Sequence, residues 1–539
     1  MSRRAGILVP LFSIPSTRSW GIGEIGDIEP LARWLAGAGQ SILQLLPINE
    51  MPPQERSPYS ALSAMAIDPQ FISMAAVEDF AAIGGEASLE ARMRGQLNAV
   101  RAARAIDYTT VRALKQHALR RSFEHFRDRE WTGATRRASA FRAFCDEQSW
   151  WLDDYSLFRA LHARYGERGW TEWPVPVRDR DPHALDAARG ELTDDIMFRR
   201  YLQWLAGDQW SAARDRAGTV SLFGDLPFMV SGDSADVWAR QDEFRIDLSV
   251  GVPPDAFSDT GQDWGLPAYR WDVFADRDFD WLRHRARRNA DLYHGYRIDH
   301  LVGFYRTYYR DGRGEAGFTP PDEASQLALG ERVVRVFRDG GAEVIAEDLG
   351  TVPDFVRASL ARLGVPGYKV FRWERHWDEP GQPFREPAEY AQISVATSGT
   401  HDTEPLAVWW EQAPAEERAG VLDVPSVRAR VAAEALPGED SKFSPALREA
   451  LLEALNASGS DLLILPIQDL FGWRDRINRP ATVGDDNWTW RLPWPSDCLS
   501  TEPEAMSVAS RARDRATRHG RSGVSVIASN SDGADTRRI

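Results

Sequence analysis

The stretch "GYRIDH", Gly295 to His300, has the pattern of a buried strand that ends in charged and polar side chains. It follows an amphipathic, arginine-rich helical pattern, "FDWLRHRARRNADLYH" (279–294). Side chains two apart in a strand share a face, so Arg297 and Asp299 project the same way and the cation stabilises the negative charge of the carboxylate. Taken alone, the motif is better explained by a structural ion pair at a strand end. The rest of the chain decides between these interpretations.

Seven other apolar runs of strand type lie along the chain, each followed by a helical pattern. They are "GILVPLF" (6–12), "SILQLLPIN" (41–49), "VSLFGDLPF" (220–228), "EVIAEDLG" (343–350), "GYKVFRWE" (367–374), "ISVATSGTHD" (393–402) and "LLILPIQDL" (462–470). Near-continuous apolar strands that alternate with helices are typical of a parallel sheet covered on both faces. Eight such units predict an α/β fold, the (β/α)8 TIM barrel, for which about 250 residues suffice.

Two of the helical patterns are especially clear. "DIEPLARWLAGAG" (27–39) has Pro30 in its first turn and Leu31, Trp34 and Leu35 on one face. "TVPDFVRASLARLG" (351–364) begins near a proline and ends in Gly364, a residue that favours a helix C-terminus. Both match helices that cover a barrel.

A chain of 539 residues is much longer than the barrel requires, so the remainder must be insertions. We expect a catalytic barrel over residues 1–498 with mostly helical insertions at about 50–215 and 403–460. The segment 499–539 loses apolar periodicity and gains Ser, Gly, Asp and Arg, and we expect it to be a disordered tail.

The composition excludes several classes of partner. The net charge of −15 argues against nucleic acid and anionic membranes, both of which need a basic face. Cys145 and Cys498 have neither metal-ligand nor disulfide spacing, and no apolar run has the length of a signal peptide core or a membrane span. These features predict a soluble, cytoplasmic protein. The 21 tryptophans stand out, because their flat rings are good platforms for sugars.

Polar side chains gather where the predicted strands end. They are Asp225, Arg297, Asp299, His300, Glu347, Asp348, His401, Asp402 and Asp469. In a TIM barrel the active site lies at the C-terminal ends of the strands. Helix capping would explain one such carboxylate, but five strands that carry them on one rim favour an active site.

A rim of carboxylates is typical of glycoside chemistry or of metal binding. No calcium-loop pattern or ordered set of histidines accompanies it, so we expect no metal and no other cofactor. Glycoside cleavage needs two carboxyl groups in different protonation states. Asp299 lies beside Arg297, whereas Glu347 ends the apolar run "VIAE", whose surroundings would raise its pKa as a general acid requires.

Two other motifs carry less weight. "GIGEIG" (21–26) matches a dinucleotide-binding pattern, but it lies about ten residues past its strand and Glu24 would repel a pyrophosphate. We interpret it as a glycine-rich turn before a helix capped by Asp27. "GTHD" could be a histidine–aspartate relay, but no nucleophile elbow accompanies it, and His401 more plausibly donates to a hydroxyl.

From about residue 6 to 495 the chain resembles the 4-alpha-glucanotransferases, also called amylomaltases or disproportionating enzymes, which are relatives of the α-amylases. The resemblance rests on an ordered set of motifs. They are "SPY" (57–59), "GDLPF" (224–228), "GVPPDAFSDTGQDWG" (251–265), "RIDH" (297–300), "AEDLG" (346–350), "THD" (400–402) and "NWTWR" (487–491).

The resemblance implies a role for each matching residue. Asp299 would be the nucleophile, Glu347 the general acid and base, and Asp402 the stabiliser of the transition state. Substrate would be bound by Ser57, Tyr59, Asp255, Gln262, Trp264, Arg297 and His401. The mechanism would be retaining, with the Asp299 and Glu347 carboxyls about 5–5.5 Å apart.

The implied reaction transfers α-1,4-glucan segments from a donor maltooligosaccharide to the 4-hydroxyl of an acceptor. The segment 251–265 would exclude water. The resemblance also implies a monomer or homodimer. One departure from the family pattern is Thr403-Glu404 after the His-Asp pair, which bears on local sugar contacts.

A retaining α-glucan hydrolase of amylase type is the alternative function, and a non-catalytic glucan-binding protein would have lost Asp299 or Glu347.

Overall fold

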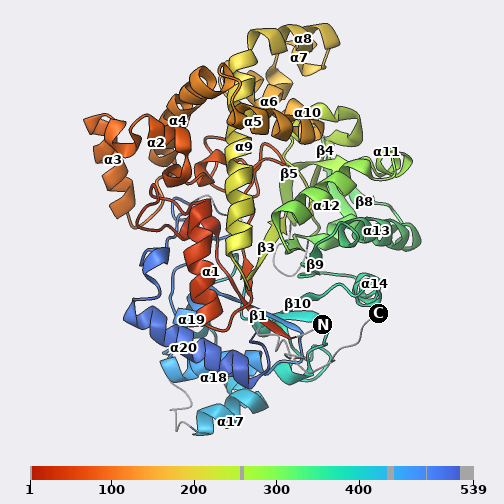
Figure 1. The fold of residues 1–539 in the computed structure, drawn as a ribbon. Coiled ribbons are helices and arrows are strands. Elements are labelled where there is room, and N and C mark those ends of the chain that lie inside the picture. The colour runs from red at the N-terminus through yellow and green to blue at the C-terminus, as the bar shows by residue number, and fades with distance from the viewer. Residues whose placement is uncertain (1–2, 255–259, 434–441, 481, 483, 523–539) are drawn as a thin grey trace, which may run out of the picture.

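Eight parallel strands close into a barrel at the centre of the molecule (Figure 1). The computed structural model describes residues 3–254, 260–433, 442–480, 482 and 484–522. The barrel strands are β1 (Arg4–Leu8), β2 (Ile42–Gln44), β3 (Ser221–Leu226), β6 (Gly295–Ile298), β9 (Glu343–Ala346), β10 (Gly367–Val370), β11 (Ser394–Thr397) and β12 (Leu462–Pro466). They neighbour one another in chain order, with β1 paired to β12. Seven of them lie within a predicted apolar run and β1 begins two residues before its run, so the predicted TIM barrel is confirmed.

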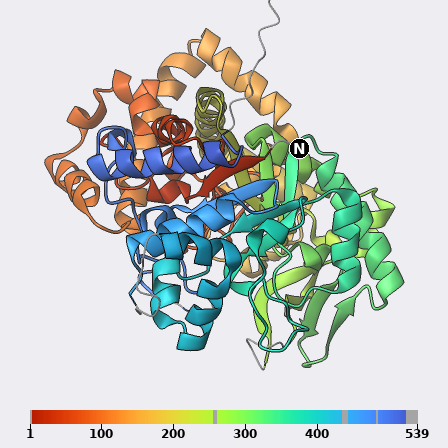
Figure 2. The ribbon, with the colours of Figure 1, turned by 90° about the horizontal axis from the view of Figure 1, so that it is seen from below.

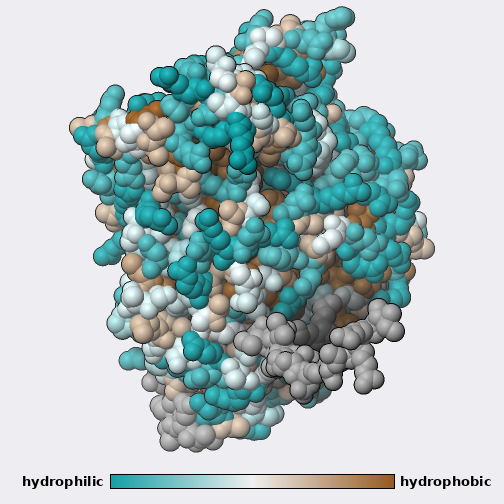
Figure 3. Space-filling view, viewed as in Figure 1, coloured by the Kyte–Doolittle hydropathy of each residue, from teal (hydrophilic) through white to brown (hydrophobic). Residues whose placement is uncertain are grey.

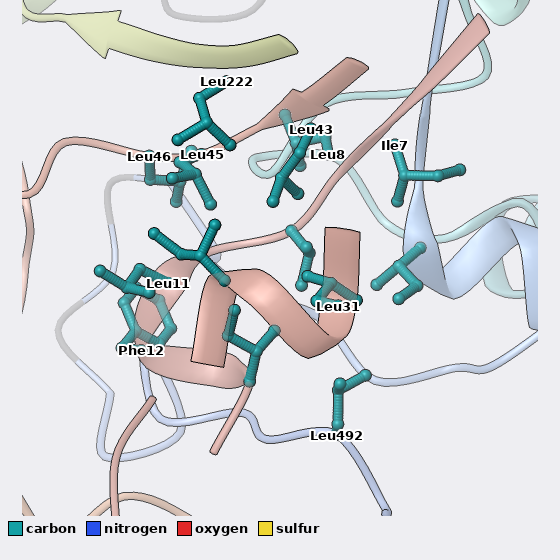
Figure 4. Close-up of a cluster of buried hydrophobic side chains, with 14 of the residues drawn as sticks. Ile7, Leu8, Leu11, Phe12, Leu31, Leu43, Leu45, Leu46, Leu222 and Leu492 are labelled. Carbon is teal, nitrogen blue, oxygen red and sulfur yellow. The ribbon is translucent and has the colours of Figure 1, made fainter. Parts of the chain in front are cut away.

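Helices follow most of the barrel strands and cover the outside of the barrel. They are α1 (Ile28–Gly37), α9 (Thr193–Arg216), α12 (Asp280–Leu292), α13 (Glu323–Arg338), α14 (Asp354–Leu363), α18 (Pro445–Asn456) and α20 (Pro503–Arg518). Figure 4 shows Leu31 of α1 in the same cluster as Leu8, Leu43 and Leu222 from the first three barrel strands, all of them buried. The predicted apolar face of this helix therefore forms part of the core, and Gly364 ends α14 in the left-handed conformation as expected.

The connection from β10 to β11 differs from the expected pattern of strand and helix. It contains two single 3-10 turns, Phe371–Trp373 and Pro387–Glu389, instead of a covering helix. Prolines at 380, 383 and 387 remove backbone donors and restrict the preceding residues, so the segment cannot form a regular helix. The turn Pro387–Glu389 packs against α18, and Phe371, Phe384 and Tyr390 of this connection are buried, so a packed loop takes the place of the helix.

The predicted helical insertion lies between β2 and β3 and stands above the barrel in Figure 1. It comprises α2 (Glu78–Ala82), α3 (Ala91–Ala102), α4 (Tyr108–His125), α5 (Arg136–Glu147), α6 (Ser149–Arg164), α7 (Val175–Arg178), α8 (Pro182–Glu191) and the long α9. The second insertion, between β11 and β12, comprises α15 (Leu406–Gln412), α16 (Ala415–Asp423), α17 (Pro425–Ala433) and α18. Shorter helices elsewhere are α10 (Ala235–Ala239), α11 (Trp271–Asp276) and α19 (Ile467–Phe471).

One part of the surplus sequence is not helical, contrary to expectation. The strands β4 (Phe244–Val252), β5 (Gln262–Tyr269), β7 (Thr307–Asp311) and β8 (Ala316–Thr319) form an antiparallel sheet in the order β5-β4-β7-β8. This sheet is split along the chain, since β6 of the barrel lies between its two hairpins. The strand β4, "FRIDLSVGV", alternates apolar and polar residues over nine positions and was a usable signal that sequence reasoning missed. The strands β7 and β8 are shorter and only partly apolar, so their pattern is weak.

The predicted disordered tail is wrong for its first half. Residues Pro503–Arg518 form α20, which packs against α1, α18 and α19 and lies on the outside of the barrel (Figure 2). Its buried face consists mainly of small residues, Ala505, Val508, Ala509, Ala512 and Ala516. Its other positions are largely polar or charged, so the helix is amphipathic, but the polar composition of 499–539 as a whole outweighs this pattern. Residues 523–539 lie outside the described part of the chain.

The face drawn in Figure 3 is mostly hydrophilic, with apolar residues scattered between polar ones. This pattern is ordinary for a protein surface, where single apolar side chains need no partner. Among the described residues, no helix combines the length and apolar character needed to cross a bilayer.

Candidate active site

Arg297 lies at the centre of the polar residues in the barrel mouth. Strands β3 and β6 pair so that Asp225 and Arg297 are direct neighbours, and the guanidinium Nη1 lies 2.6 Å from Asp225 Oδ2. Its Nη2 lies 2.6 Å from Asp299 Oδ1, as the spacing in "RIDH" predicts. One buried arginine therefore orients two carboxylates from adjacent strands, and Asp299 keeps 31% of its side chain exposed to the mouth.

Glu347 follows β9 and is joined to the residue after Asp299. Its Oε2 accepts a hydrogen bond of 2.8 Å from the backbone N–H of His300. Desolvation at this position raises the pKa of Glu347 to about 8, and the negative charge of Asp299 adds to the effect. The carboxyl is mostly protonated at neutral pH, which is the state that a general acid needs.

The backbone at His300 is in the left-handed region, with φ of 44°. This conformation is uncommon for residues other than glycine and is typical of functional sites. Here it aims the His300 N–H at Glu347. Burial lowers the pKa of the His300 side chain to about 4, so the ring is neutral at physiological pH.

Asp402 reaches the mouth from the end of β11. Asn478 Nδ2 donates a hydrogen bond of 2.7 Å to Asp402 Oδ1, and Arg476 donates one of 2.7 Å to the Asp402 carbonyl. The Nε2 atom of His401 lies 3.3 Å from Asp402 Oδ2. The carboxylate is 42% exposed, so it is held in place but remains open to a ligand.

Tyr59 joins the helical insertion to both sides of the mouth. Its hydroxyl donates a hydrogen bond of 2.7 Å to Asp225 Oδ2 and lies 2.9 Å from His401 Nε2. Its ring stacks on His401 with centroids 5.4 Å apart. Ser57 shapes the turn that carries Tyr59, because its carbonyl accepts from the Ser60 N–H. His401 Nε2 therefore has a hydroxyl partner within the protein itself.

The hairpin of β4 and β5 places Trp264 beside His300, with ring centroids 5.0 Å apart in an edge-on arrangement. Gln262 Oε1 accepts a hydrogen bond of 3.1 Å from Trp264 Nε1. These two predicted substrate residues therefore lie next to the residue that follows Asp299. The predicted Asp255 lies outside the described residues.

Two carboxylates of the predicted rim have a structural task instead. Asp348 Oδ1 accepts from the Tyr368 N–H at 2.7 Å. Asp469 is 1% exposed and accepts from the Leu406 N–H and from the Ser398 hydroxyl. Asp469 therefore satisfies the first backbone donor of α15, and Asp348 binds the backbone of β10.

The residues after Asp402 also have partners. Glu404, the departure from the family pattern, lies 2.6 Å from Arg372 Nη1 and 3.4 Å from Arg476 Nη1. It therefore braces Arg476, the residue that binds the Asp402 carbonyl. This departure stabilises the loop behind Asp402.

Sequence reasoning missed Asn478 and Trp488. Trp488 lies 5.9 Å from both Tyr59 and His401 by ring centroids, in the left-handed region with φ of 63°. The motif "NWTWR" contains Trp488 and was a usable signal. Asn478 lies in an irregular segment without any pattern, so no sequence signal could have identified it.

Comparisons with known proteins agree with this fold. The profile of a family described as 4-alpha-glucanotransferase, glycoside hydrolase family 77, matches residues 9–497. Relatives include a 4-alpha-glucanotransferase of Chlamydia pneumoniae, 32% identical over 91% of this chain and 91% of its own length. One of Thermus thermophilus is 32% identical over 91% of this chain and 95% of its own.

A solved structure of an amylomaltase from Streptococcus agalactiae in complex with acarbose has a similar fold, with a TM-score of 0.79 and 25% identity. The match covers 96% of this chain and 99% of that one. The ordered motifs, the confirmed barrel and the profile that spans most of the sequence lead to one conclusion. The chain belongs to glycoside hydrolase family 77, the 4-alpha-glucanotransferases.

Proposed function

We propose that Asp299 is the nucleophile, Glu347 the general acid and base, and Asp402 the transition-state stabiliser of a retaining 4-alpha-glucanotransferase. One observation carries these roles: Glu347 bonds to the backbone of His300, directly after Asp299, yet the two carboxyls have opposite environments. Asp299 is ion-paired with Arg297, and Glu347 has its pKa raised to about 8. A nucleophile and an acid need this division.

In the first step Asp299 attacks the anomeric carbon of the donor while Glu347 gives its proton to the departing glycosidic oxygen. The bond to the leaving glucan breaks and a glucosyl ester of Asp299 forms. In the second step the Glu347 carboxylate takes the proton of the acceptor 4-hydroxyl, whose oxygen attacks the same carbon and releases Asp299. Each half-reaction inverts the carbon, so the α configuration is retained.

Asp402 is placed to hold ring hydroxyls of the reacting sugar, because its carboxylate is open to the mouth and fixed by Asn478. Arg297 orients the carboxylate of Asp299, and His401 and Tyr59 form part of the same sugar site. Ser57, Asp255, Gln262 and Trp264 complete the proposed substrate contacts. An edge-on tryptophan next to His300 supports a covered site in which an acceptor sugar competes well against water.

The proposed donors and acceptors are maltooligosaccharides and longer α-1,4-glucans, with roles in starch or glycogen metabolism. Membership of the family favours transfer over the alternative of hydrolysis by an amylase-type enzyme. We further propose that the protein acts in the cytoplasm as a monomer or homodimer and needs no cofactor.

Incubation with pure maltotriose tests the function directly. We expect glucose together with a ladder of longer maltooligosaccharides and a constant number of reducing ends, since transfer conserves glycosidic bonds. Reducing ends that rise in step with glucose and maltose would mean that water is the acceptor, and the transferase assignment would be overturned.

A further inference from the structure

His162 lies where the helical insertion meets the loop that leads from β3 to α10. Its side chain, on α6, is 2% exposed, and each of its ring nitrogens faces a carboxylate. Nδ1 lies 2.7 Å from Glu167 Oε2, in the turn after α6, and Nε2 lies 3.0 Å from Asp233 Oδ2, in the loop after β3. An ionised carboxylate only accepts hydrogen bonds, so both nitrogens donate and the ring is an imidazolium.

The charged groups around His162 favour this state. Burial lowers the pKa of the ring, but the hydrogen bonds to Asp233 and Glu167 outweigh burial, so the pKa of His162 is raised. Arg159, one turn earlier on α6, lies 3.1 Å from Glu167 Oε2 and opposes the shift through its own charge. The rings that pack beside the imidazole, from α6 and from the segment after it, are aromatic and carry no charge.

The turn that carries Glu167 holds the carboxylate in place for this contact. Gly166 and Glu167 both have a left-handed backbone, with φ of 72° and 59°, and the Glu167 N–H donates a hydrogen bond of 2.8 Å to the His162 carbonyl. This conformation is unfavourable for a glutamate and persists where surrounding contacts fix it. Burial raises the pKa of Glu167, but the hydrogen bond from His162 and the charge of Arg159 lower it to about 2, so the carboxylate is ionised at neutral pH.

The loop that Asp233 belongs to, residues 227–234, reaches the proposed catalytic groups. The insertion holds this loop through Trp170 as well, whose backbone N–H donates at 3.1 Å to Asp233 Oδ1 and whose indole donates at 2.8 Å to the loop backbone. Near the start of the loop, Phe228 packs on the ring of His300, with centroids 5.6 Å apart. His300 is the residue that follows the proposed nucleophile.

The helix at the far end of the loop is bonded to the segment that carries Tyr59. The Ala235 N–H donates a hydrogen bond of 2.8 Å to the Leu62 carbonyl, and the Ala64 N–H donates one of 2.7 Å to Asp236 Oδ2. A shift of the loop is therefore transmitted to both sides of the sugar site.

We propose that His162 is a positioning residue for the barrel mouth, and that its charged form clamps the loop after β3 to the helical insertion. While both ring nitrogens donate, Glu167 and Asp233 are held on opposite sides of one rigid ring. When the ring gives a proton to solvent, one nitrogen presents a lone pair to a carboxylate, and that side of the clamp opens. The protonation state rests on the geometry alone, whereas the effect on turnover rests on the proposed function.

NMR of the full-length protein with labelled histidine rings tests the charge directly. The signal of His162 is the one that His162→Gln lacks. We expect it to titrate above the ordinary value of about 6.5, and its midpoint to fall in Asp233→Asn, which keeps the shape of the side chain but removes its charge. A wild-type midpoint at or below 6.5, or one that Asp233→Asn leaves unchanged, would overturn the proposal.

The pH dependence of the His162→Gln effect tests the positioning role. Glutamine is uncharged and has one nitrogen donor, so kcat/KM on maltotriose should fall about three- to tenfold near pH 6. The ratio of wild-type to variant kcat/KM should then decline toward one as pH rises through the pKa of His162, because the wild type loses the same charge. Titration of Glu347 cancels in this ratio, since both enzymes contain it.

His183→Gln is the matched control, because it makes the same substitution at an exposed histidine of the same insertion. It should leave kcat/KM and its pH dependence unchanged. A ratio for His162→Gln that is constant with pH, or a variant in which only the Tm falls, would show a purely structural role and overturn the proposal. If His162→Gln does not fold, Asp233→Asn should show the same declining ratio. A wild type that makes no transfer products from maltotriose would contradict the proposed function, while the NMR titration would still decide whether the clamp exists.

Discussion

The two sides of the barrel mouth hold their carboxylates by different means. On the side of β6 and β9, Asp299 and Glu347 are fixed by neighbours on adjacent strands, Arg297 and the His300 N–H. On the side of β11, Asp402 is fixed by Asn478, which is 76 residues away in sequence. On the side of β6 and β9, the neighbours control both the position and the protonation state of the carboxyl groups. On the side of β11, Asn478 controls only the position of Asp402.

This difference indicates how the site divides its work. Acid–base chemistry depends on the protonation state of Glu347, which burial and the nearby charges control. Stabilisation of the transition state depends on geometry, which a tether can adjust without a change in charge. Mutations on the first side should therefore change chemistry and pH dependence, and those on the second side should change positioning.

The largest effect is expected from Asp299→Asn, which removes the nucleophile and with it the covalent route. The turnover number on maltotriose should fall by about 10⁴-fold or more, by analogy with the removal of other catalytic nucleophiles. Glu347→Gln should lower the turnover number by about 10²–10⁴-fold, because it removes the general acid and base. Asp348→Asn is the matched control, because Asp348 bonds to the backbone of Tyr368 and should affect stability more than turnover. Turnover within tenfold of wild type in either catalytic variant would contradict the assignment.

The pH profile should show the raised pKa of Glu347. The proton that it gives to the leaving group is lost as pH rises through about 8, so kcat/KM should fall above this pH by about tenfold per unit. Initial rates with maltotriose between pH 6 and 10, in buffers of constant ionic strength, would measure this. If kcat/KM already falls by about tenfold per unit from pH 6 upwards, the acid has an ordinary pKa and is not desolvated.

Asn478→Ala tests the side of the barrel mouth that carries Asp402. Loss of the amide frees Asp402 to move, and kcat/KM should fall by about ten- to a hundred-fold with the alkaline limb unchanged. Asn478→Asp should be at least as poor, because it places a second anion against Asp402. Thermal unfolding serves as the control for a general loss of structure. A shift of the alkaline limb in Asn478→Ala would show that the two sides are not separable.

The smallest effect is expected from Tyr59→Phe. The ring still stacks on His401, but the hydrogen bond to Asp225 is lost. A typical hydrogen bond contributes about 1 kcal/mol net, so the rate should fall about three- to tenfold. Tyr59→Ala removes the ring as well and should cost clearly more, and equal losses in the two variants would mean that the ring contributes nothing.

The barrel and the roles of Asp299 and Glu347 could be predicted because short stretches of the sequence indicate them. Eight apolar runs mark the strands, and "RIDH" and "AEDLG" place Asp299 and Glu347 at strand ends. The antiparallel sheet could not be predicted in the same way, since β6 interrupts it and its pairings connect distant segments. Tertiary context, rather than a local pattern, decides such pairings.

The second side of the site shows the same limit. Asn478 and Glu404 act through contacts with residues that are far away in sequence, and neither lies in a regular element with a periodic signal. The amphipathic helix α20 was missed because it stands within a segment whose overall composition is polar. In each case the structure of the segment depends on the residues that pack against it, which its own sequence does not reveal.

The pairing of β1 with β12 has a consequence for biosynthesis. The first strand of the chain gains its last neighbour only when residues Leu462–Pro466 have been made, and Arg521 then ties α20 to the carbonyls of Asn456 and Ser460. Until that moment the nascent chain exposes an unpaired strand edge, which is a template for aggregation. A ribosome that stalls late therefore releases a product suited to chaperone capture or degradation, even though every proposed catalytic carboxylate is already present.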